Sequence, residues 1–162
     1  MMELKQTELS KWLKGIIVFA GLIGAALCFW IVPALGKETA RENPGLSGLF
    51  RPCLTFVWIT AVPFYFALWK SWQICREIAK DNSFCRENGK RLRDIGALAV
   101  SESLLYFAAA VILLILKLLH PGVLLLILFI IFAGTAAAVV CAALSHLVEK
   151  ACDLKQENDL TI

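Results

Sequence analysis

The sequence contains little charge and none of the common motifs of enzymatic chemistry. Asp, Glu, Lys and Arg make up 18% of its 162 residues, and the formal net charge is +3. It contains no HExxH zinc motif, no P-loop, no GxGxxG dinucleotide motif and no Ser-His-Asp arrangement. We therefore expect a protein that is not an enzyme and that uses no cofactor.

The sequence also lacks the cysteine patterns of a metal site or a disulfide framework. Its six Cys form no CxxC pair and no Cys/His cluster at metal-ligand spacing. Cys75, Cys85 and Cys152 fall on the side of the membrane that the charge distribution assigns to the cytoplasm, where thiols stay reduced. We expect free thiols that pack as small hydrophobic side chains, and no bound metal.

Hydrocarbon side chains are abundant, since 59% of the residues are hydrophobic. A helix needs about 20 apolar residues to cross a bilayer, and the sequence contains four such runs. We therefore predict an all-α, polytopic membrane protein in which residues 1–162 form one domain, an up-and-down bundle of four transmembrane helices. The predicted spans are 15–35, 52–74, 95–119 and 122–148.

The distribution of positive charge predicts the orientation of these spans. Cytoplasmic segments of membrane proteins hold an excess of Lys and Arg. With both termini on one side, that side holds twelve of the sixteen Lys and Arg residues, and the other side holds Lys37, Arg41, Arg51 and Lys117. We expect a multi-pass protein of the bacterial cytoplasmic membrane, with the N-terminus, the loop 75–94 and the tail 149–162 in the cytoplasm.

Glu102 is the only acidic residue inside a predicted span. A carboxylate at the centre of a membrane helix costs about 2.5–3.5 kcal/mol on insertion scales, so such residues often mark a functional site. Tyr106 lies one turn along the same helix face, Tyr65 lies at the same depth on the second span, and Ser101 and Ser103 flank Glu102. We expect these five residues to form a polar pocket, either a proton-linked or ligand-sensing site or a structural hydrogen bond between helices.

The loop 75–94 is the most basic stretch of the sequence, and it has two interpretations. It can attract anionic lipid headgroups, or it can form a docking surface for a soluble protein together with the tail. Acidic residues interleave the basic ones, which argues against direct binding of nucleic acid. The residues of the predicted docking surface are Arg86, Asn88, Lys90, Arg91, Arg93, Asp159, Leu160, Thr161 and Ile162.

Two stretches of the sequence resemble a known family. Residues 82–96 read NSFCRENGKRLRDIG, and the tail ends in ENDLTI. They are similar to the signatures NPF…EN.KRLR.IG and E..DLTI of a bacterial four-helix membrane family catalogued as domain of unknown function 2975. The sequence departs from that pattern at Ser83, where proline is usual. The resemblance implies a gene often found beside a helix-turn-helix regulator of the Xre type, and hence a cytosolic DNA-binding partner.

These observations lead to two hypotheses about function. The first is a non-enzymatic, regulatory or sensory integral membrane protein that binds a cytosolic transcriptional regulator through loop 75–94 and the C-terminal tail. The alternative is a small transporter or channel subunit, working as a homo-oligomer, that uses Glu102 within the membrane. The first hypothesis requires the tail, whereas the second requires a water-accessible path to Glu102.

Overall fold

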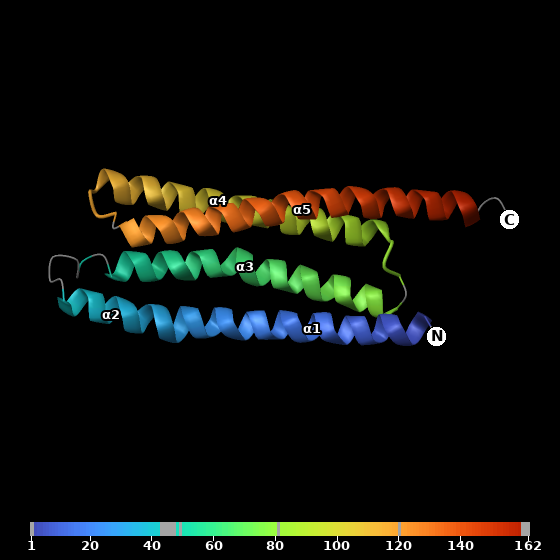
Figure 1. The fold of residues 1–162 in the computed structure, drawn as a ribbon, viewed down its shortest axis with the longest axis horizontal. Helices are drawn as coiled ribbons and strands as arrows, with labels where there is room; N and C mark the ends of the chain where they lie inside the picture. Colours follow the sequence, from blue (N-terminus) through green and yellow to red (C-terminus); the bar gives the residue numbers. More distant parts are fainter. Residues whose placement is uncertain (1, 43–47, 49, 81, 120, 160–162) are drawn as a thin grey trace.

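The chain is helical almost throughout. A computed structural model describes residues 2–42, 48, 50–80, 82–119 and 121–159 (Figure 1). It contains α1 (Met2–Ala26), a π-helical turn η1 (Leu27–Ile31), α2 (Val32–Glu42), α3 (Phe50–Ala79), α4 (Arg86–Ile115) and α5 (Pro121–Asp159). The described residues include no strand.

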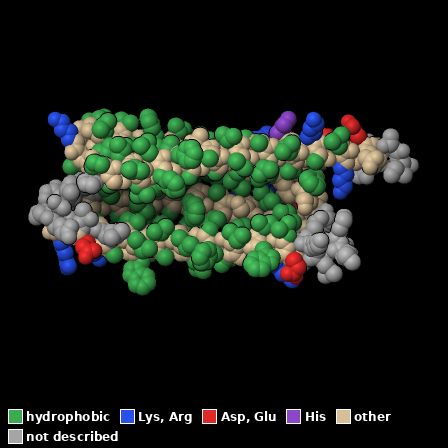
Figure 2. All heavy atoms as spheres, in the orientation of Figure 1, with side chains coloured by type: hydrophobic (Ala, Val, Ile, Leu, Met, Phe, Trp, Pro, Cys, Tyr) green, Lys and Arg blue, Asp and Glu red, His purple; other side chains and the backbone are tan. Residues whose placement is uncertain are grey.

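Four helical segments are long and apolar enough to cross a membrane. They are Glu8–Glu38, Phe50–Ala79, Arg86–Ile115 and Pro121–Asn158. Hydrophobic side chains cover the length of the molecule, and charged side chains gather at its two ends (Figure 2). Such a surface suits a bilayer, because lipid rather than water then covers the apolar side chains. The prediction of an all-α protein with four spans is confirmed.

The helices run alternately up and down and pack in the order of the chain. Helix α1 packs against α3, α3 against α4, and α4 against α5, while α2 continues α1 and also contacts α3. Among the described residues, α5 packs on α4 alone and α1 makes no contact with α4. Both termini and the α3–α4 connection lie at one end of the molecule, which we call the terminal end (Figure 1).

The helices extend further at the terminal end than the predicted spans. Helix α3 continues to Ala79 and α4 begins at Arg86, so most of the predicted loop 75–94 is helical and the connection is short. Lys, Arg and Glu are good helix formers, which is why the polar residues 86–94 are the first turns of α4.

The opposite end of α4 comes earlier than predicted. The helix ends at Ile115, and Lys117 adopts a left-handed conformation with φ of 58° that reverses the chain. Pro121 then begins α5, where its missing N–H leaves no intrahelical bond unmade. Residues 116–119 of the predicted third span therefore lie in the turn.

The π-helical turn η1, which lies between α1 and α2, accepts a hydrogen bond from α3. The Val32 N–H donates to the Leu27 carbonyl, five residues earlier. Pro33 has no N–H, so the Cys28 carbonyl, five residues before it, lacks the donor that this hydrogen-bonding pattern would supply. The Trp58 indole Nε1 of α3 lies 3.5 Å from that carbonyl and donates to it. A side chain of α3 thus compensates for the bond that proline removes.

The contact between α4 and α5 follows a narrow seven-residue repeat. Apart from the half-buried Ile130, Glu149 and Ala151, the buried and half-buried residues of α5 recur at alternating intervals of four and three, the pattern of a coiled-coil seam. We call these residues, with Gly89, Gly96 and Ser103 of α4, the tight seam. The α5 members are Ile127, Ile131, Gly134, Ala138, Cys141, Ser145, Val148 and Cys152.

Small residues bring the two helices of the tight seam together. A Cβ atom at Gly96 would lie 3.4 Å from the Ala138 carbonyl oxygen. A Cβ atom at Gly134 would clash with Ser103 Oγ and lie 3.3 Å from the Ala99 carbonyl oxygen. Small side chains permit this close approach, which supplies packing contacts where lipid offers no hydrophobic driving force.

Candidate functional site

The face of α4 that packs against α3 carries polar side chains from the terminal end to mid-helix. Lys70 Nζ lies 2.8 Å from Asp94 Oδ2. Further along, the Tyr106 hydroxyl lies 3.4 Å from Thr60 Oγ1. Glu102 lies one turn from Tyr106 and two turns from Asp94, so it points to the same side of α4. We call these five residues the polar seam.

Glu102 is the residue of the polar seam whose hydrogen bonding is incomplete. Its side chain is half-buried, and Oε2 is buried without a hydrogen-bond partner among the described residues. The Lys70–Asp94 and Thr60–Tyr106 pairs set the antiparallel register and place Glu102 at about the level of Pro63. Pro63 lies inside α3 and has no backbone N–H, so residue 63 cannot donate a hydrogen bond to the Glu102 carboxylate.

The structure brings only part of the predicted polar pocket together. Tyr65 donates from its hydroxyl to the Gly21 carbonyl, at 2.9 Å, and therefore points to α1 rather than to Glu102. Ser101 is exposed, and Ser103 is buried in the tight seam. Both serine hydroxyls donate to backbone carbonyls of α4 itself. The prediction that Tyr106, Tyr65, Ser101 and Ser103 surround Glu102 is therefore corrected. Of these four residues, Tyr106 alone lies on the same face of α4 as Glu102.

Thr60 takes the place that the sequence analysis assigned to Tyr65. It is 3% exposed and donates to the Val57 carbonyl at 3.1 Å while its oxygen faces Tyr106. The ring of Phe56 packs edge-on against Tyr106, with centroids 5.3 Å apart. One row of buried and half-buried residues of α3 follows this face at intervals of four and three, although other half-buried residues of α3 lie outside it. The row contains Phe56, Thr60, Pro63, Ala67, Lys70 and Ile74.

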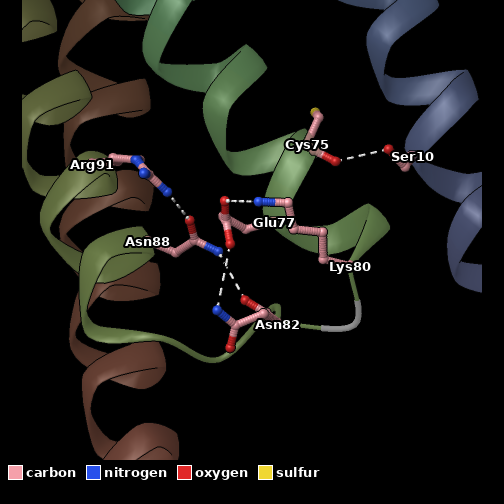
Figure 3. A network of polar contacts seen from close by, with 7 residues as sticks. All are labelled: Ser10, Cys75, Glu77, Lys80, Asn82, Asn88 and Arg91. Carbon is pink, nitrogen blue, oxygen red and sulfur yellow. Dashed lines mark hydrogen bonds and ion pairs between the residues drawn. The ribbon is translucent and has the colours of Figure 1, made fainter.

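A second polar cluster closes the terminal end around Asn88 (Figure 3). Asn88 is 1% exposed. Its side-chain Nδ2 donates to the Ser83 carbonyl at 3.1 Å and to the Asn82 carbonyl at 3.5 Å. Arg91 Nη1 donates to Asn88 Oδ1 at 2.8 Å. Asn88 thus satisfies backbone groups of the α3–α4 connection, a role that a buried amide fills well.

The same end of α3 is tied to its own connection and to α1. Glu77 accepts from Lys80 Nζ at 3.3 Å and from Asn82 Nδ2 at 3.4 Å. The Ser10 hydroxyl of α1, which is 1% exposed, donates to the Cys75 carbonyl at 2.8 Å (Figure 3). The hydrogen bond of Ser10 places this part of α1 beside the end of α3.

Helix α5 is bound to the beginning of α4 by one hydrogen bond and two ion pairs. Ser145 Oγ donates to the Gly89 carbonyl at 2.7 Å. Arg93 Nη2 lies 2.7 Å from Glu149 Oε1, and Arg86 Nη2 lies 3.0 Å from Asp153 Oδ1. These contacts add to the tight seam at the beginning of α4.

These contacts correct part of the predicted docking surface. Asn88 is buried and cannot meet a partner, while Arg91 is half-buried and donates to it. Arg86 and Arg93 pair with α5, although most of each side chain is exposed, and Lys90 is exposed. Asp159 is the last described helical residue. The predicted contacts of Leu160, Thr161 and Ile162 lie outside the described residues.

Four helical segments long and apolar enough to cross a membrane define a multi-pass integral membrane protein. Within the described ranges, no group of three His, Cys, Asp or Glu side chains is placed to hold a metal ion. The chain belongs to the family described as "Protein of unknown function (DUF2975)", whose model matches residues 34–162. The resemblance seen in residues 82–96 and in the tail is confirmed.

A curated relative covers nearly the whole chain. The sequence is 32% identical over 153 residues to the uncharacterized membrane protein YoaS of Bacillus subtilis (strain 168). The match covers 93% of this chain and 96% of that protein. No solved structure matches the chain.

Proposed function

We propose that the protein is a non-enzymatic regulatory membrane protein that binds a cytosolic helix-turn-helix regulator at its terminal end. The observation that carries this proposal is the length of α5. Its 39 residues span about 58 Å at 1.5 Å per residue, whereas the hydrocarbon core of a bilayer is about 30 Å thick. Its last turns extend past the first residue of α4 (Figure 1).

The surface available to a partner combines positive charge with an exposed apolar side chain. Lys90 is exposed, and the paired Arg86 and Arg93 side chains remain 71% and 67% exposed. Beyond the Arg86–Asp153 ion pair, Leu154 is 59% exposed. The excess of Lys and Arg at this end favours a cytoplasmic location, where a soluble regulator can reach it.

Affinity purification from native membranes tests this proposal. The variants are the intact chain, a chain that lacks residues 155–162, Lys90→Glu and Lys117→Glu. The deletion leaves both ion pairs between α4 and α5 in place, and Lys117 is an exposed lysine at the opposite end. We expect the intact chain and Lys117→Glu to retain a small DNA-binding protein, and the deletion and Lys90→Glu to lose it. Equal recovery from all four would contradict the proposal.

We propose a small transporter or channel subunit as the second candidate, because Glu102 Oε2 is buried without a hydrogen-bond partner among the described residues. Buried ionisable residues in membrane helices often line the paths of ions or protons. Ion flux in proteoliposomes separates the two candidates. A transporter loses flux in Glu102→Gln and keeps it when residues 155–162 are removed, whereas a regulator shows no flux in either protein.

A further inference from the structure

The contact between α3 and α4 is polar in one half and apolar in the other. From the terminal end inward it contains the Lys70–Asp94 pair, then Glu102, then the Thr60–Tyr106 pair. Glu102 lies about 12 Å along α4 from Asp94 and about 6 Å from Tyr106. Beyond Tyr106, α4 continues as residues 107–115, which are all apolar. The polar seam therefore reaches Glu102 from one end only.

No neighbouring helix supplies a counter-ion to Glu102. On its own face of α4, the titratable neighbours are Tyr106 and Asp94, and α3 contributes Lys70, which is engaged by Asp94. Helix α5 packs on the other face of α4, through the tight seam, where its titratable side chains are Cys141 and Cys152. Helix α1 makes no contact with α4 among the described residues.

The hydroxyl donors nearest to Glu102 along the polar seam are already engaged, since the Tyr106 hydroxyl lies 3.4 Å from Thr60 Oγ1. The Thr60 hydroxyl already donates to the Val57 carbonyl. Pro63 has no N–H, so the Ile59 carbonyl, one turn earlier, lacks its helical donor. A carboxylate only accepts, whereas a protonated carboxyl also donates one hydrogen bond. Addition of a proton therefore removes a buried charge and supplies a donor where donors are scarce.

We propose that Glu102 is a proton-binding site that exchanges with water at the terminal end through the polar seam. Binding forms one O–H bond on the carboxylate and releases nothing, and the reverse step returns the proton to the same side. The site requires neither a cytosolic partner nor transport across the membrane, so it goes beyond both proposed functions. A regulator can use this site to sense pH. A transporter can use it as the part of a proton path that connects Glu102 with the terminal end.

Labelling with a hydrophobic carbodiimide tests the proposal on the full-length protein. Dicyclohexylcarbodiimide modifies protonated carboxyl groups within hydrocarbon, and mass spectrometry locates the product. The protein is reconstituted in one orientation in vesicles of phosphatidylcholine and phosphatidylglycerol. We expect labelling of Glu102 to fall as the pH on the terminal side rises, and to ignore the pH on the other side. Glu102→Asp should keep the label, and Glu102→Gln should lose it.

A substitution within the contact tests the route. Ala67 is half-buried on α3 between Pro63 and Lys70, so Ala67→Leu narrows the polar seam, while Ala97→Leu adds the same bulk at an exposed position of α4. Ala67→Leu should slow the response of labelling to a pH jump, and Ala97→Leu should leave it unchanged. Equal responses in both variants would overturn the proposed route.

Infrared spectroscopy provides a second measurement that needs no reagent to enter the protein. The carbonyl band of a protonated carboxyl group should appear when the pH is lowered, and it should be absent from Glu102→Gln. Labelling that follows the pH of the opposite side, or a band unchanged by the substitution, would overturn the proposal. Protection of Glu102 by sodium at constant pH would overturn it as well, because the site would then bind a metal cation.

Discussion

Helix α4 meets its two neighbours with faces of opposite chemistry. Towards α5 it presents Gly89, Gly96 and Ser103 at seven-residue intervals, and the helices approach until a single added Cβ would touch backbone. Towards α3 it presents Asp94, Glu102 and Tyr106, of which Glu102 keeps one buried oxygen without a hydrogen bond among the described residues. One face is closely packed, and the other is polar and incompletely bonded.

The difference separates two tasks within one helix. Close packing of small residues fixes the α4–α5 pair, because every displacement loses contacts that lipid does not replace. A polar contact with an unused acceptor can gain a bond when its charge changes, so it can respond to conditions. Stability and response are therefore assigned to opposite sides of α4.

Enlarging the tight seam should have the largest effect on stability. Gly134→Leu places a side chain against Ser103 and the Ala99 carbonyl, and we expect the free energy of unfolding to fall by about 3 kcal/mol. Equilibrium unfolding in mixed micelles measures the change. Ala133→Leu, at the adjacent exposed position, is the control and should change stability little. Equal losses in both variants would show that the seam is not closely packed.

Removing the Asn88 amide should have the next largest effect. Asn88→Ala leaves the Ser83 carbonyl and the Arg91 guanidinium without that partner, and we expect a loss of about 2 kcal/mol. Lys90→Ala, exposed two residues away, is the control. If Asn88→Ala is as stable as the control, the hydrogen bonds of the Asn88 amide do not stabilise the α3–α4 connection.

Replacing Glu102 should raise the stability of the protein, whereas the two preceding substitutions should lower it. Glu102→Leu removes a buried oxygen that lacks a hydrogen bond, and we expect stability in mixed micelles to rise by about 1 kcal/mol. Ser101→Leu, at an exposed neighbouring position, should have no such effect. A loss of stability in Glu102→Leu would mean that the carboxyl group makes a structural bond, and the contrast between the two faces of α4 would fail.

The smallest effect should come from the ion pairs at the start of α4. The Arg93 side chain is 67% exposed and that of Glu149 33% exposed, so we expect their coupling energy to be less than about 1 kcal/mol and to fall at high salt. A double-mutant cycle with Arg93→Gln and Glu149→Gln measures it. A larger coupling, insensitive to salt, would show that these pairs rather than the small residues hold α5 in register.

Hydropathy alone predicted the four membrane-spanning helices and singled out Glu102, because both depend on how costly polar groups are in lipid. It did not predict where the helices begin. Residues 86–94 are mostly charged and fall in the predicted loop 75–94, yet they are the first turns of α4. Hydropathy indicates where an apolar stretch begins. The beginning of a helix is set by its backbone hydrogen bonds, which polar residues can form as well.

The sequence also did not predict how each helix is rotated about its own axis. Almost every residue of α5 between 121 and 144 is apolar, so the apolar pattern there shows no preferred face; the repeat of small and buried residues emerges only once α4 is beside it. The same uncertainty placed Tyr65 beside Glu102, although its hydroxyl bonds to α1. Depth in the membrane follows from counting along a helix, but direction requires knowledge of the neighbour.

The linear packing order of the helices bears on how the protein is made. Among the described residues, each of the four membrane-spanning segments contacts only the segments next to it along the chain, with α1, η1 and α2 taken as the first. During synthesis, every newly inserted helix therefore finds its partner already in the membrane, and none must wait for a distant segment. Insertion and folding can proceed in step from α1 to α5, and the tight α4–α5 pair forms last.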